Sequence, residues 1–187
     1  MKKKVSVMRT AVTAALALLS ASASMAQTAP ARFNPKAPEN SQLVPAFNYA
    51  AVESVLDSIG ARHQRAGTAP NRPVILAHFA NNRRAVLVLS ACDDQGSACK
   101  ALSIQSYWTK IVNSPADRTA EAIAGFNRRF AFAKAFVAND GRPTLQRYLT
   151  ADYGFVRGNL AVNLLVFANQ ADRFAGEVLR PLEAARP

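Results

Sequence analysis

The chain of 187 residues is long enough for one domain with an appendage, and it can bury a core without needing several disulfides or metal ions. Half of its residues are hydrophobic, which excludes an intrinsically disordered chain. The formal net charge of +11 leaves both anionic envelope components and nucleic acids open as partners.

Residues 1–26 have the three parts of a signal peptide. A basic segment ends at Arg9, an apolar segment covers residues 11–19, and a small-x-small site at residues 24–26 predicts cleavage after Ala26. The alternative, a transmembrane anchor, needs about 20 predominantly apolar residues, and this run is shorter. Cleavage removes four basic residues and no acidic one, which leaves 19 basic against 12 acidic residues and a charge of +7. We expect a periplasmic or secreted protein with no transmembrane segment after cleavage.

Residues 27–46 contain four prolines, which block a helix or a central strand, so an extended and poorly ordered linker is expected. The domain then covers residues 47–185 and begins with a helix that Asn48 caps at its N-terminus. Gly60 can end this helix in a left-handed conformation. Residues 61–72 contain three arginines, one glycine and one proline, and this composition predicts a mobile basic loop.

Three strands are predicted at residues 74–79, 85–91 and 101–107, which are rich in β-branched, leucine or aromatic residues. Residues 81–82, both asparagine, join the first two strands in a tight hairpin because asparagine tolerates a positive φ. The middle strand shows little polar alternation, which is typical of a central strand covered on both faces.

Cys92 and Cys99 flank the loop between the second and third predicted strands. In an oxidising compartment, two cysteines across a short loop favour a disulfide. A metal site would need further ligands, and His63 and His78 are isolated from this loop, so the sequence implies no metal and no cofactor.

A second helix is predicted from Ser114 as its cap, with Pro115 at the first helical position. It leads into a hairpin that turns at residues 139–141, because Asp-Gly between two alternating segments is a strong hairpin signal. Apolar residues repeat at spacings of three and four from Leu160, which predicts a closing helix that Pro181 ends. The predicted fold is α+β, a two-layer sandwich with a five-stranded antiparallel sheet and the order α-β-β-β-α-β-β-α.

Four segments together carry a family resemblance: the loop from Cys92 to Cys99, the following KALSIQSYW, the helix end GFNRRFAFAKAFVANDG and the strand TLQRYLTADYGFVRGNL. In this combination and order, the chain resembles the YbjN domain family of bacteria over residues 47–182. That family is named for regulators of sensory transduction, and its fold is similar to that of type III secretion chaperones. The resemblance implies the same order of elements and carries no established catalytic residue. Asn127 and Arg128 match an Asn-Arg pair of the family at the helix end.

The residues offer no catalytic constellation. No serine has a positioned histidine, and Asp93-Asp94 in a loop is typical of a solvated turn. We therefore expect a non-enzymatic protein; an uncharacterised periplasmic enzyme, or a domain that binds a small molecule or an anion, is the alternative. The mature chain has fifteen arginines and four lysines, which suits binding of an anionic envelope component but equally reflects base composition of the genome. Export argues against nucleic acid as a partner.

A protein partner or self-association is expected, because secretion-chaperone-like folds commonly use an open sheet surface to dimerise or to hold client segments. The tentative binding residues are Tyr107, Trp108, Asn127, Arg128, Arg147 and Tyr148. Strands that present Gln105, Tyr107, Arg147 and Tyr148 would offer the mixture of aromatic and arginine side chains that is enriched at interfaces. The alternative is that these side chains are simply solvated.

Overall fold

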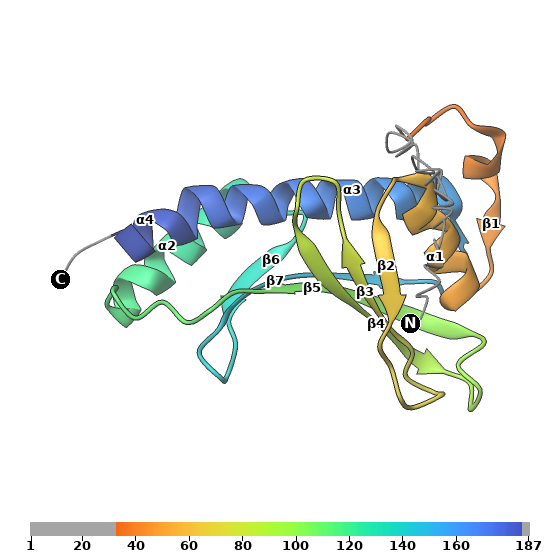
Figure 1. Cartoon of the computed structure of the whole chain (residues 1–187), viewed down its shortest axis with the longest axis horizontal. Helices are drawn as coiled ribbons and strands as arrows, with labels where there is room; N and C mark the ends of the chain where they lie inside the picture. Colours follow the sequence, from red (N-terminus) through yellow and green to blue (C-terminus); the bar gives the residue numbers. More distant parts are fainter. Residues whose placement is uncertain (1–32, 185–187) are drawn as a thin grey trace, which may run out of the picture.

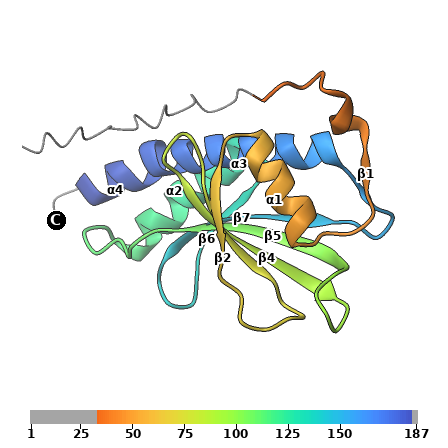
Figure 2. The same cartoon turned by 45° about the vertical axis from the view of Figure 1, so that its right-hand side comes forward.

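The computed structural model describes residues 33–184. The predicted signal peptide, its cleavage site and the beginning of the predicted linker lie outside the described residues. Figure 1 shows two layers, with the helices on one side of an antiparallel sheet, and Figure 2 shows the same layers after a turn of 45°. The longest helix runs across the whole sheet. The loops at residues 66–73, 93–98 and 138–142 extend away from this helix.

The main sheet contains β2 (Arg62–Arg65), β3 (Val74–His78), β4 (Arg84–Cys92), β5 (Cys99–Tyr107), β6 (Lys134–Val137) and β7 (Pro143–Thr150). These strands pair antiparallel in the spatial order β2-β3-β4-β5-β7-β6. The helical layer contains α1 (Tyr49–Ser58), α2 (Ala116–Arg129) and α3 (Arg157–Phe174), which continues through the π-helical η2 (Ala175–Leu179) into α4 (Arg180–Ala184). The α+β class and the antiparallel sheet are confirmed, but the sheet has six strands and the prediction of five is wrong.

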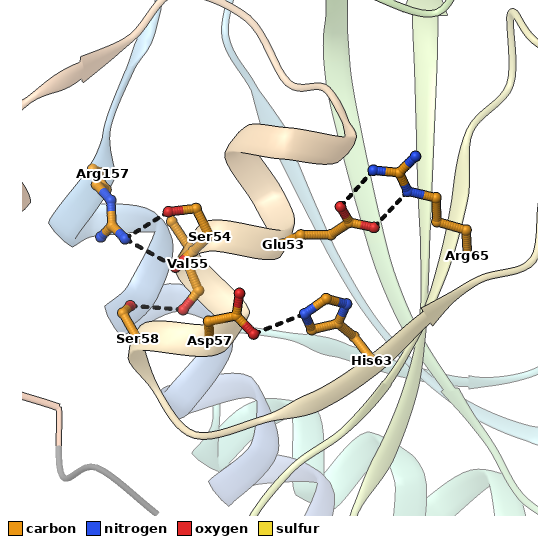
Figure 3. A network of polar contacts seen from close by, with 8 residues as sticks. All are labelled: Glu53, Ser54, Val55, Asp57, Ser58, His63, Arg65 and Arg157. Carbon is orange, nitrogen blue, oxygen red and sulfur yellow. Dashed lines mark hydrogen bonds and ion pairs between the residues drawn. The ribbon is translucent and has the colours of Figure 1, made fainter.

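The additional strand is β2, which lies in the segment that was expected to be a mobile loop. Its sequence, RHQR, contains no apolar residue, so it lacks the alternation that predicts a half-buried strand. Polar contacts with α1 take the place of apolar burial on its helix side. Arg65 donates to both carboxylate oxygens of Glu53 at 2.7 Å, and Nε2 of His63 lies 2.9 Å from Oδ1 of Asp57 (Figure 3). Both carboxylates come from α1, so this helix fixes the edge strand.

The described part of the predicted linker is ordered, contrary to expectation. A short 3-10 helix, η1 (Pro38–Ser41), precedes β1 (Leu43–Val44), and β1 pairs antiparallel with β8 (Phe155–Val156) in a separate two-stranded sheet. Pro38 lies at the start of η1, where a backbone N–H would have no hydrogen-bond acceptor within the helix, so its missing N–H costs nothing. Asn40 is buried and donates to the carbonyl of Asn34 at 2.8 Å. The pairing of β1 with β8 orders this segment, and the number of prolines in the segment does not predict such a long-range contact.

The first helix begins and ends as predicted. The Asn48 side chain accepts a hydrogen bond from the N–H of Ala51 at 2.9 Å, and Gly60 after the helix has a φ of +70°. Asn82 has a φ of +61° in the predicted hairpin, and Gly141 has one of +81° in the other. These turns form where asparagine and glycine tolerate the left-handed region.

Two helix boundaries differ from prediction. Pro115, not Ser114, takes the N-cap position of α2, and its side chain cannot cap this end because it has no hydrogen-bond acceptor. Pro181 does not end the last helix, which continues to Ala184. In η2 the backbone N–H of Arg180 donates to the carbonyl of Ala175, five residues back. This wider turn changes the hydrogen-bond register just before the proline, which allows the helix to continue.

Candidate binding surface on the open face of the sheet

The two faces of the sheet have different surroundings. Ile75, Leu87 and Ile104 point toward the helices and are fully buried. No described helix covers the opposite face, where Val86 and Val88 of β4 are only half-buried. The prediction that β4 is covered on both faces is therefore wrong. All the helices pack on the face that carries the larger apolar side chains, because burying them there removes the most apolar area from water.

The surface without helices is called the open face here. Strand register brings to it side chains from all six strands, namely Arg62, Gln64, Leu76, His78, Arg84, Val86, Val88, Ser103, Gln105, Tyr107, Lys134, Phe136, Thr144, Gln146 and Tyr148. None of these residues is acidic. The open face is therefore partly apolar and carries only positive formal charge.

A hollow of about 430 Å³ opens on this face over β2, β3, β4 and β5, and it is called the β2–β5 hollow. The open-face side chains that line it are Arg62, Gln64, Leu76, His78, Arg84, Val86, Gln105 and Tyr107. Leu76 is 37% exposed, which is a large fraction for a leucine in the middle of a sheet. The hollow thus combines apolar, amide, phenol and cationic groups.

His78 lies between the two arginines of the hollow and is neutral there. Its Nδ1 accepts a hydrogen bond from Nη2 of Arg62 at 2.5 Å, which requires that this nitrogen carry no proton. Desolvation of the ring, followed by the charges of Arg62 and then Arg84, lowers the pKa of His78. His78 therefore serves as an acceptor that orients Arg62, and the two guanidinium groups supply the charge.

The charges of Arg62 and Arg84 are not neutralised by neighbouring acids. Within residues 33–184, no carboxylate lies within 4.0 Å of either guanidinium group. Five other arginines of the described residues do pair with a carboxylate, among them Arg65 with Glu53 and Arg83 with Asp172, both at 2.7 Å. The β2–β5 hollow is therefore a site of uncompensated positive charge.

Polar and aromatic groups extend the open face beyond the hollow. The amides of Gln105 and Gln146 both donate to the hydroxyl of Ser103, at 2.7 and 2.9 Å. Tyr148 is 56% exposed, and the Tyr107 ring lies 4.8 Å from the guanidinium carbon of Arg142. Side chains of this kind can make hydrogen bonds and stacking contacts with an extended peptide.

The tentative binding residues from the sequence do not form one cluster. Tyr107 and Tyr148 lie on the open face, as expected. Arg147 points to the helix side, where it donates to the carbonyl of Phe132 at 2.6 Å and stacks over its ring. Successive residues of a strand face opposite ways, so the expectation that Arg147 and Tyr148 share a surface is wrong. Trp108 packs edge-to-face on Phe174 with ring centroids 5.1 Å apart.

The other two tentative residues lie on α2. Asn127 forms two hydrogen bonds with the backbone of Ala135, and Arg128 is exposed to solvent. Asn127 thus has a structural role. Whether any of the six tentative residues contacts a partner stays a prediction.

Sequence reasoning missed most of the residues of the hollow, including its basic side chains Arg62, His78 and Arg84. A partial signal existed, since His78 and Arg84 lie on either side of the predicted Asn-Asn hairpin, but a two-residue turn at residues 81–82 would pair His78 with residue 85, and only the observed register pairs it with Arg84. Arg62 gave no such signal, because its strand is polar at every position. Only the pairing of β2 with β3 places Arg62 opposite His78.

The predicted disulfide is present. Cys92 and Cys99 are opposite each other in the β4–β5 register, and their sulfur atoms are bonded at 2.06 Å. In the described part of the chain, no three His, Cys, Asp or Glu side chains are grouped so that they could hold a metal ion. None of the helices between residues 33 and 184 has the length and apolar character needed to cross a bilayer.

Comparison with protein families agrees with the resemblance seen in the segments around the disulfide loop and the second hairpin. The family model YbjN, described as "Putative bacterial sensory transduction regulator", matches residues 48–180. Comparison with curated proteins gives no match. The family match extends from the cap of α1 to the beginning of α4 and so includes every strand of the six-stranded sheet. The chain belongs to the YbjN family.

Proposed function

We propose that this protein is an exported, non-enzymatic regulatory module that binds a protein partner, or a second copy of itself, on the open face of its sheet. Family membership supports a regulatory role, and the tripartite leader in residues 1–26 supports export to the periplasm or beyond. The fold similarity to type III secretion chaperones, which the family resemblance implies, is part of the proposal.

The observation that carries the proposal is the composition of the open face. A sheet surface without helix cover presents the exposed Leu76 and Tyr107 next to uncompensated arginines, and the exposed Tyr148 further along the same face. Aromatic and arginine side chains are enriched in protein interfaces, and acidic and lysine side chains are depleted there. A solvated surface with no partner would more often mix charges of both signs.

Site-specific photocrosslinking in cells that produce the full chain tests this proposal. A photoreactive phenylalanine analogue replaces Tyr148 on the open face, and a matched control replaces Val162, which is 46% exposed on α3. We expect protein adducts from position 148 and none from position 162. Absence of adducts from position 148, or equal adducts from both, contradicts binding on the open face.

Cell fractionation tests the export part separately. We expect the mature chain in the periplasm or medium, with Gln27 as its N-terminal residue. An uncleaved chain in the cytoplasm contradicts export and leaves the binding result to be judged independently.

A further inference from the structure

We infer that the β2–β5 hollow is a carboxylate-binding site and that its occupant is an acidic, extended segment of the protein partner. The inference rests on the proposed function, because it names the chemistry that the open face recognises. It assigns the recognition to Arg62 and Arg84, which the sequence did not single out.

Strand register places these two arginines so that both can reach one anion. Arg62 pairs with His78 across β2 and β3, and His78 pairs with Arg84 across β3 and β4. The three residues therefore form a row on the open face, and two strand spacings separate the arginines by about 10 Å. Side chains as long as arginine can converge over His78 from this distance. A planar guanidinium group matches the two oxygens of a carboxylate.

The hollow is arranged to favour an anion before any ligand arrives. Arg62 uses one N–H on Nδ1 of the neutral His78, which holds the guanidinium group in the hollow with its other donors free. Two like charges near a neutral ring repel each other, and a bound anion relieves this repulsion. No acid within residues 33–184 pairs with either arginine, so an external carboxylate meets no internal competitor.

The other lining groups favour a peptide over a compact inorganic anion. Leu76 and Val86 lie between the arginines and the middle of the sheet, and a phosphate ion would leave their apolar surface uncovered. Gln64 and Gln105 offer amides that can hydrogen-bond to a peptide backbone. A volume of about 430 Å³ accommodates an acidic side chain together with an apolar neighbour.

Solution NMR on the mature chain tests the inference, because the Nε–Hε signal of an arginine side chain shifts when its guanidinium group binds an anion. The probe is the blocked peptide acetyl-Leu-Glu-Leu-Glu-Leu-amide, and the matched neutral probe has Gln in place of both Glu residues. We expect the acidic peptide to shift the signals of Arg62 and Arg84, and the neutral peptide to shift neither. Sodium phosphate at the same concentration serves to distinguish a peptide from a compact anion.

Two charge-matched double variants complete the experiment. Arg62→Gln with Arg84→Gln should weaken binding of the acidic peptide about tenfold or more, because each charge-assisted hydrogen bond is lost. Arg118→Gln with Arg180→Gln removes the same charge from exposed helix positions and should leave the affinity unchanged. Both double variants should keep the thermal stability of the parent, since all four side chains are exposed.

The inference is overturned if the acidic peptide shifts no arginine signal up to its solubility limit, or if the neutral peptide binds equally well. Equal affinity in the Arg62 and Arg84 double variant also overturns it. Displacement of the peptide by equimolar phosphate overturns the assignment of a peptide as the occupant. Crosslinking from position 148 separates this inference from the proposed function. If the Arg62 and Arg84 double variant captures a partner as well as the parent does, the proposed function stands and the carboxylate site is rejected. If the parent binds the acidic peptide but captures no partner, the carboxylate site stands and the proposed function is rejected.

Discussion

The side chain of Asn127 on α2 satisfies both main-chain groups of Ala135 on β6: it accepts from the Ala135 N–H at 2.8 Å and donates to the Ala135 carbonyl at 2.9 Å. Ala135 faces β7 on its other side, where Leu145 is its register partner. Asn127 thus occupies the outer edge of β6, where another strand would otherwise pair. Free edge groups invite pairing with other chains, so this contact protects one edge of the sheet.

Replacement of Asn127 by alanine should destabilise the domain. Ala135 is 1% exposed, so its N–H and carbonyl would lose their partners in a buried place. We expect the free energy of unfolding in urea to fall by about 1–3 kcal/mol, the usual cost of leaving buried polar groups unpaired. The amide of Ala135 should also exchange faster with deuterium. Arg128→Ala, at the exposed neighbouring position, is the control and should change stability by less than about 0.5 kcal/mol. Equal stability of Asn127→Ala and the parent would show that the contact contributes nothing.

The disulfide should contribute to stability through the unfolded state. Cys92 and Cys99 close a loop with a sequence separation of 7, for which chain entropy assigns roughly 2.5 kcal/mol. The double variant Cys92→Ala with Cys99→Ala should lose about this much in urea denaturation. Intact-mass measurement of exported protein should show two hydrogens fewer than after reduction. Ready alkylation of both thiols in native, unreduced protein would contradict the bond.

Acid should selectively weaken the contact between α1 and β2. Hydrogen bonds from Arg65 hold the pKa of Glu53 below its usual range, so the folded state favours the ionised carboxylate. A lowered folded pKa stabilises the protein above the unfolded pKa, and this stabilisation disappears as pH falls through the folded value. The melting temperature of the parent should therefore exceed that of Glu53→Gln at neutral pH, with the difference shrinking between about pH 5 and pH 3. A difference that stays constant over this range would contradict the role of the ionised pair.

Trp108 and Tyr148 should respond differently to replacement by alanine. Trp108 packs on Phe174 at the edge of the core, so its loss should destabilise the domain, though by less than the ~3–5 kcal/mol of a fully buried tryptophan. Tyr148 is exposed on the open face, and its replacement should change stability by less than about 0.5 kcal/mol. Thermal denaturation measures both effects. Only the Tyr148 variant is suitable for binding assays, and destabilisation by this variant would show that the ring supports the fold instead.

Much of the domain follows from local sequence. Asn48, Gly60, Asn82 and Gly141 mark the ends of elements because their backbone and side-chain preferences act within a few residues. Apolar spacing in α3 and in β3 to β5 likewise predicted the element types. The short spacing of the two cysteines predicted the disulfide between them. These features need no knowledge of what lies on the other side of the fold.

The sixth strand and the candidate site were decided by tertiary contacts. β2 is polar at every position and becomes a strand because α1 supplies Glu53 and Asp57 opposite Arg65 and His63. Arg62 gains its place beside His78 through the register of β2 with β3. The register of β7 with β5 turns Arg147 to the helices and Tyr148 to the open face. The sequence shows which residues alternate along a strand. Which face of the sheet the helices cover depends on the packing of segments that are far apart in the chain. Within residues 33–184, the same packing places no acidic side chain beside the two arginines of the hollow.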